Sequence, residues 1–91
     1  MAADESITIT IKYMVNLSEK AGRKEETVVL PRGATLKTVA DWIQVNRDIT
    51  IPSPSIMATL NGRGWNQYTD KEQTPVGEGA KVMLFPPISG G

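Results

Sequence analysis

This 91-residue sequence predicts an α+β fold in which a mixed sheet of four to five strands has one main helix packed across it. The chain has the length of a single domain, and its 40% apolar and 22% charged residues are typical of a globular protein. Apolar residues alternate with polar ones near the N-terminal end of the chain, and a short continuous apolar run lies near the C-terminal end; both patterns are typical of strands. Between these segments one stretch changes to helical spacing, which predicts the helix.

The first strand is predicted over residues 7–15 (ITITIKYMV), where β-branched residues alternate strictly with other residues. Five residues are expected to share its buried face: Ile7, Ile9, Ile11, Tyr13 and Val15. The polar residues 16–26 predict a connection with a short helical turn, and the pair Glu25 and Glu26 is expected to be solvated. Residues 27–31 (TVVLP) predict a second strand that forms a hairpin with the first.

The helix is predicted over residues 34–47 (ATLKTVADWIQVNR), with Thr35 as its N-cap. Its apolar stripe, Leu36, Val39 and Ile43, is expected to pack against the sheet. The two prolines within residues 48–55 end regular structure.

Three further strands complete the predicted sheet. Residues 56–62 (IMATLNG) predict a strand closed by a turn, 64–68 (GWNQY) a short fourth strand, and 81–86 (KVMLFP) the last one. The last strand is apolar on both faces, which predicts a central position beside the first strand. This order of elements predicts the β-grasp fold of ubiquitin. Residues 7–85 would form one domain, with a flexible lead over 1–6 and a flexible tail over 86–91.

Composition excludes several kinds of chemistry. The chain has no cysteine and no histidine, which excludes disulfides, thiolate nucleophiles, Cys/His zinc sites and imidazole acid–base catalysis. Ten basic residues balance ten acidic ones, so no basic surface for nucleic acid or an anionic membrane is expected. The N-terminal segment lacks the features of a signal peptide, and no apolar run approaches the length of a membrane span. We therefore expect a cytoplasmic protein with no metal site and no tightly bound cofactor.

The ending FPPISGG, residues 85–91, needs an explanation because a diglycine has no side chains to bury. Pro86 and Pro87 are expected to end the last strand and direct the tail away from the sheet. Accident or truncation would also produce such an ending. A domain that only binds partners, with a tail of no importance, is therefore one alternative.

Four segments carry a resemblance to a known family: residues 13–22 (YMVNLSEKAG), 30–43 (LPRGATLKTVADWI), 60–62 (LNG) and 77–91 (GEGAKVMLFPPISGG). Together they resemble the MoaD/ThiS-type ubiquitin-like sulfur carriers, and are most similar to the small subunits of molybdopterin synthase. The final segment is the most specific of the four. Ser18 stands where the family usually has an arginine.

The resemblance implies that the α-carboxylate of Gly91 is the reactive group. A partner adenylating enzyme would use ATP to couple Gly91 to AMP, and a desulfurase or rhodanese would supply the sulfur that turns it into a thiocarboxylate. The carrier would then donate this sulfur to molybdopterin synthesis, within a heterotetramer of two small and two large subunits. It would contribute no catalytic side chain of its own.

The tail and a surface patch are the predicted contacts with these partners. Five tail residues would thread into the partner's active site: Pro86, Pro87, Ile88, Ser89 and Gly90. Met14, Trp65 and Phe85 are expected to form an exposed apolar patch at the partner interface. Two further functions stay open, namely sulfur delivery to thiamine, cysteine or thionucleosides, and a protein modifier that joins Gly91 to lysine through an isopeptide bond.

Overall fold

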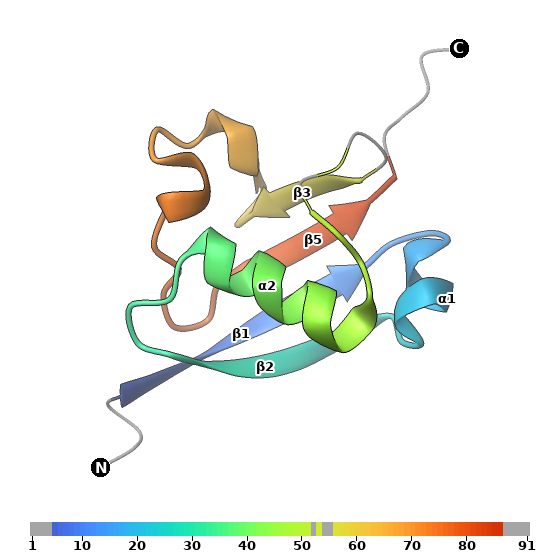
Figure 1. Cartoon of the computed structure of the whole chain (residues 1–91), viewed down its shortest axis with the longest axis horizontal. Coiled ribbons are helices and arrows are strands. Elements are labelled where there is room, and N and C mark those ends of the chain that lie inside the picture. The colour runs from blue at the N-terminus through green and yellow to red at the C-terminus, as the bar shows by residue number, and fades with distance from the viewer. Residues whose placement is uncertain (1–4, 52, 54–55, 87–91) are drawn as a thin grey trace.

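A mixed sheet of five strands crosses the molecule in the order β2–β1–β5–β3–β4, and one helix lies across one face of it (Figure 1). The structure, a computed structural model, describes residues 5–51, 53 and 56–86. The strands are β1 Ser6–Tyr13, β2 Glu25–Pro31, β3 Met57–Leu60, β4 Arg63–Gly64 and β5 Lys81–Phe85. The helices are α1 Leu17–Ala21 and α2 Leu36–Arg47, and two short 3₁₀ turns are η2 Trp65–Gln67 and η3 Lys71–Gln73.

The strand pairing confirms the predicted β-grasp topology. β1 and β2 form an antiparallel hairpin in which Ile9 lies opposite Val28. β1 and β5 run parallel, and β5 pairs on its other side with β3 in the antiparallel sense. The last strand is therefore central and lies beside the first, as its apolar run predicts.

The predicted helix is confirmed, and its apolar stripe faces the sheet. Leu36, Val39 and Ile43 have no exposed surface. Thr35 precedes the helix in an extended conformation, and its N–H donates to Thr38 Oγ1 at 3.1 Å. This contact satisfies a backbone donor that the first turn of the helix leaves free.

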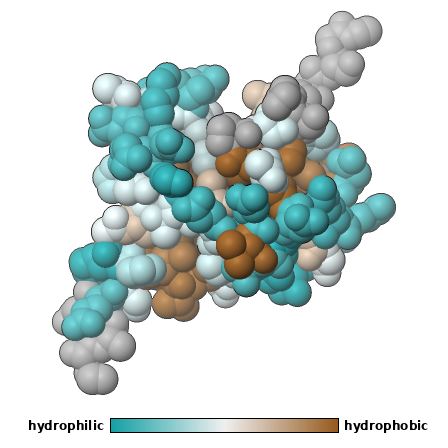
Figure 2. Space-filling view, viewed as in Figure 1, coloured by the Kyte–Doolittle hydropathy of each residue, from teal (hydrophilic) through white to brown (hydrophobic). Residues whose placement is uncertain are grey.

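The core lies between α2 and the sheet. It is formed by alternate residues of β1, β2 and β5, the stripe of α2, and two isoleucines of the segment that follows α2, Ile49 and Ile51. Seen from the α2 side, hydrophilic residues cover most of the surface (Figure 2). No helix among the described residues is long and apolar enough to span a membrane.

The fourth strand is shorter than predicted. It covers only Arg63–Gly64, and the residues that follow form η2 instead of a strand. The Trp65 side chain packs against the core, and the Tyr68 hydroxyl donates to the Leu60 carbonyl oxygen at 2.6 Å. Both contacts hold residues 65–68 against the core and the end of β3, so the chain does not continue as a strand paired with β3.

Val15 is also not where alternation predicts it. β1 ends at Tyr13, and the Val15 side chain is 73% exposed rather than buried. The Leu17 N–H donates to the Met14 carbonyl oxygen at 3.1 Å, and Leu17 is buried. The chain therefore turns into α1 immediately after β1, and this turn takes Val15 out of the strand.

Glu26 is not solvated, because it joins β2 to the end of α2. Its side chain is only 10% exposed. Arg47 Nη2 donates to Glu26 Oε1 at 2.6 Å and Arg47 Nε to Oε2 at 2.8 Å, while the Tyr13 hydroxyl also donates to Oε2 at 2.6 Å. The hydrogen bonds from Arg47 lower the pKa of Glu26. Burial, then the bond to Glu26, raises the pKa of Tyr13.

Candidate functional site

The central strand ends where the predicted reactive tail begins. β5 stops at Phe85, and Pro86, which is partly exposed, is the last residue that the structure describes in this segment. The other predicted tail residues lie outside the described residues: Pro87, Ile88, Ser89, Gly90 and Gly91. The candidate site is therefore the surface around the point at which the chain leaves β5.

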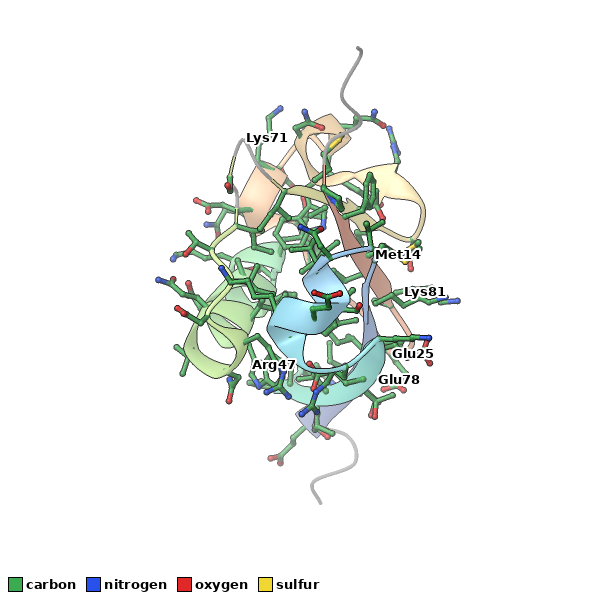
Figure 3. All side chains as sticks on the ribbon, turned by 90° about the vertical axis from the view of Figure 1, so that its right-hand side faces the viewer. Met14, Glu25, Arg47, Lys71, Glu78 and Lys81 are labelled. Atoms are coloured by element: carbon green, nitrogen blue, oxygen red, sulfur yellow. The ribbon has the colours of Figure 1, made fainter. Side chains whose placement is uncertain are left out.

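An apolar row crosses this point on the open face of the sheet, opposite α2. Register places Met57 of β3 directly across from Phe85. The Met14 N–H donates to the Leu84 carbonyl oxygen at 2.9 Å, so Met14 lies beside Phe85 on the other side. Figure 3 shows Met14 on the side of the sheet away from α2. We name Val15, Met14, Phe85 and Met57 the exit strip.

The exit strip is accessible. Met57 is 48% exposed and Val15 73% exposed, while Met14 and Phe85 are partly exposed. Four large apolar side chains of the described residues are strongly exposed, and two of them belong to this strip. Apolar surface gathered in one place is typical of a protein interface.

The open face becomes more polar with distance from the exit strip. In the next row, Met83 pairs with Thr59 on one side and Lys12 on the other. Lys12 Nζ lies 3.9 Å from Glu25 Oε1. Farther along, Thr10 pairs with Lys81, and Figure 3 shows Lys81 beyond Met14 on the same side. Val29 of β2, which pairs with Thr8, is a further exposed apolar residue on this face, away from the exit strip. The exit strip is therefore where several apolar side chains lie side by side.

A shallow depression of about 530 Å³ adjoins one end of the exit strip. Its lining residues are Lys12, Tyr13, Met14, Val15, Ser18, Lys24 and Glu25. The Ser18 hydroxyl donates to the Val15 carbonyl oxygen at 2.9 Å, so at this position the side chain stabilises the turn. Within the described ranges, no group of three or more acidic side chains could hold a metal ion.

The structure brings two of the three predicted interface residues together. Met14 and Phe85 are neighbours, whereas Trp65 is partly buried against the core. Trp65 lines a hollow of about 300 Å³ with Ala40 of α2, on the opposite side of the sheet from Met14. Trp65 also lines a second hollow, of about 280 Å³, with Met57 of the exit strip. Trp65 thus adjoins the strip at its Met57 end while it packs against the core.

Sequence reasoning missed Met57 and assigned Val15 to the buried face. Met57 alternates with Ile56 and Ala58, which pack against the core, so its outward position could have been read from the same period that predicts the strand. Val15 carries no comparable signal. Its exposure depends on the turn that follows β1.

Comparisons with known proteins agree with this fold. The sequence model of the ThiS family matches residues 11–91. No curated protein sequence matches the chain.

Three solved structures share the fold. The HVO 2177 protein of Haloferax volcanii is 22% identical, with a TM-score of 0.77 over 96% of this chain and 89% of that chain. A Pyrococcus furiosus protein described as molybdopterin converting factor, subunit 1, is 22% identical, with a TM-score of 0.75 over 90% of this chain and 99% of that chain. SAMP1 of Haloferax volcanii is 21% identical, with a TM-score of 0.71 over 92% of this chain and 99% of that chain. At such identities the likeness concerns the fold alone.

Proposed function

Because the chain belongs to the ThiS family, we propose that it is a sulfur carrier whose Gly91 α-carboxylate is converted to a thiocarboxylate. One observation supports this most strongly. The chain leaves the central strand of the sheet at Pro86, in the middle of the exit strip. A rigid strand and an apolar docking surface thus lie at the root of the predicted tail.

The proposed chemistry begins with activation of the carboxylate. A carboxylate with a pKa near 3.5 is ionised at neutral pH, and its negative charge repels a nucleophile. In the proposed first step, an oxygen of Gly91 attacks the α-phosphorus of ATP and pyrophosphate leaves, which forms an acyl-adenylate. Hydrosulfide then attacks the carbonyl carbon and AMP leaves, with loss of one proton. The product is a terminal thiocarboxylate.

The acceptor is attacked by this thiocarboxylate sulfur. The sulfur adds to the electrophilic carbon of a polarised double bond in the acceptor, and the electron pair of that double bond takes up a proton. Water then hydrolyses the thioester bond between the sulfur and the Gly91 carbonyl carbon, which leaves the sulfur on the acceptor as a thiol. Gly91 returns to a carboxylate and can be charged again. Such a carrier is a co-substrate, and a chain without cysteine and histidine suits that role because the partner enzymes supply the catalytic groups.

The reach of the tail explains why an interface at its root is needed. Residues 86–91 span at most about 20 Å when fully extended. A partner whose active site receives Gly91 must therefore approach the surface from which the tail emerges. Met14, Phe85 and Met57 would be covered by this partner, and burial of their apolar surface would stabilise the complex.

Molybdopterin synthesis is the pathway we propose. It is supported by the resemblance of residues 77–91 to small subunits of molybdopterin synthase and by the fold shared with the Pyrococcus protein. The partners would be an adenylating enzyme, a sulfur-donating desulfurase or rhodanese, and a large synthase subunit in a heterotetramer. Thiamine, cysteine or thionucleoside synthesis would use the same carrier chemistry with another acceptor.

A protein modifier is the second candidate function. The same acyl-adenylate would lead to an isopeptide bond if a lysine amine, rather than hydrosulfide, received the acyl group. The small archaeal modifier SAMP1, which shares this fold, motivates the alternative. Conjugates of higher mass in cell extract, absent when Gly91 is deleted, would identify it.

Intact mass after reaction is the test of the proposed chemistry. We expect the chain, incubated with ATP, sulfide and the adenylating enzyme from the same cells, to gain about 16 Da, because sulfur replaces one oxygen. The matched control is the chain without Gly90 and Gly91, which should gain nothing. A chain that is never charged under these conditions, or a truncated chain that is charged equally well, would refute the proposal.

A further inference from the structure

Val15 has a backbone conformation that valine rarely adopts. Its φ is +57°, in the left-handed region. A β-branched side chain with positive φ is a genuine outlier, because its Cβ lies too close to the following carbonyl. Three other non-glycine residues in the described part of the chain share this sign: Asp48, Asn61 and Lys71. None of these three is β-branched, and Asp and Asn tolerate the conformation well.

Burial of the side chain does not compensate for this strain. Val15 is 73% exposed, so its side chain gains little from the core. Hydrogen bonds of the main chain hold the conformation instead. The Val15 carbonyl oxygen accepts from the Ser18 N–H at 3.3 Å and from the Ser18 hydroxyl at 2.9 Å. The turn needs this backbone shape, but asparagine or glycine would adopt it with less strain.

The position of Val15 supplies a reason for an apolar side chain. It follows Met14, which lies beside Phe85, so it extends the exit strip at its outer end. The other strongly exposed valines lie elsewhere: Val29 is on β2 and Val45 on α2. Among the described residues, the exposed valine with a strained backbone is thus the one beside the tail.

We infer that Val15 is an anchor residue, which inserts its side chain into an apolar pocket of the adenylating enzyme that receives the tail. This inference rests on the proposed function. The short reach of the tail requires the enzyme to cover the exit strip. Lys12, Lys24 and Glu25 border the adjoining depression. Glu25 Oε1 lies 3.9 Å from Lys12 Nζ, so the surplus positive charge is that of one lysine, and we expect an acidic group beside the enzyme's apolar pocket. Strained backbone at an exposed apolar residue is typical of sites held ready for a ligand.

Val15→Ala tests the contact, and Val45→Ala is the matched control, because Val45 is 83% exposed on α2. The readout is ATP-dependent charging of the tail by the adenylating enzyme, followed by intact mass. Loss of the two methyl groups should raise KM about tenfold and leave kcat unchanged, since the contact helps binding and not chemistry. Val45→Ala should change neither constant by more than about twofold.

Val15→Asn tests the strain. Asparagine tolerates positive φ, so this variant should melt at or above the temperature of the unchanged chain while its KM rises as in Val15→Ala. If the unchanged chain is charged but Val15→Ala has the same KM, the anchor role is wrong and the proposed function stands. If the unchanged chain is never charged, both are wrong. A Val15→Asn variant that melts at a lower temperature would refute the explanation by strain.

Discussion

The Glu26 carboxylate links β2 to β1 and to the end of α2, because Tyr13 and Arg47 both donate hydrogen bonds to it. Next to Glu25 in a polar stretch, Glu26 was expected to be solvated, yet Arg47, Tyr13 and Arg23 all donate to its carboxylate. The Arg47 guanidinium also lies 5.2 Å from the centre of the Trp42 ring. Arg47 is 21 residues from Glu26, so no local pattern could predict this pair.

Glu26→Gln should lower the free energy of unfolding by about 2 kcal/mol, because the amide cannot replace the charge-assisted bonds. Urea denaturation measures this change. Glu25→Gln is the matched control. Its carboxylate is 59% exposed and 3.9 Å from Lys12 Nζ, so the effect should stay within about 0.5 kcal/mol. Equal effects of the two variants would contradict the account of this network.

The same network should make stability depend on pH in the acid range. Because the pKa of Glu26 is lowered from its usual value of 4.5, its carboxylate contributes fully above that value, and the contribution is lost as pH falls through the folded-state pKa. The difference in unfolding free energy between the unchanged chain and Glu26→Gln should therefore be constant near neutral pH and shrink below about pH 4.5. A difference that persists undiminished at about pH 2 would contradict this.

At the level of the element, α2 depends on its apolar stripe. Ile43 has no exposed surface, whereas Val45 on the same helix is 83% exposed. Ile43→Ala should lower the free energy of unfolding by about 3 kcal/mol through lost burial and a cavity. Val45→Ala should change it by less than about 0.5 kcal/mol. Chemical denaturation of both variants measures these changes. Similar losses of unfolding free energy in the two variants would contradict the assignment of Ile43 to the buried face of α2.

Periodicity predicted the elements that bury a regular face, namely β1, β2, β5 and α2. It failed where a tertiary contact decides the local backbone. β4 stops at Gly64 because Trp65 packs on the core and Tyr68 bonds to Leu60. β1 stops at Tyr13 because the chain turns there into α1, and this turn buries Leu17. Both features depend on residues outside the pattern that was read.

The candidate site was predictable only where its residues lie on or directly after regular strands. Met14 and Phe85 were expected at an interface, and strand register makes them neighbours. Trp65 was expected to join them, but it packs on the core and lines one hollow with Ala40 and another with Met57. The composition of a loop does not reveal where its side chains pack. Only the three-dimensional path of residues 61–76 places Trp65 beside Ala40.

For the whole molecule, fold and reactive group should be separable. Among the residues that the structure describes, the buried core residues lie between Ile7 and Leu84. Removal of Gly90 and Gly91 should therefore leave the melting temperature unchanged and abolish charging completely. Thermal unfolding and ATP-dependent charging are measured on the same preparation of the truncated chain. A substantial fall in its melting temperature would contradict the claim that the tail does not stabilise the fold.

The central claim is that the reactive group is the main-chain carboxylate of Gly91. Mass analysis of the C-terminal peptide, from protein purified out of its native cells, tests it most directly. We expect a peptide that ends at Gly91, with a fraction heavier by about 16 Da that reverts on hydrolysis. A peptide that continues past Gly91 in all mature molecules would contradict the claim.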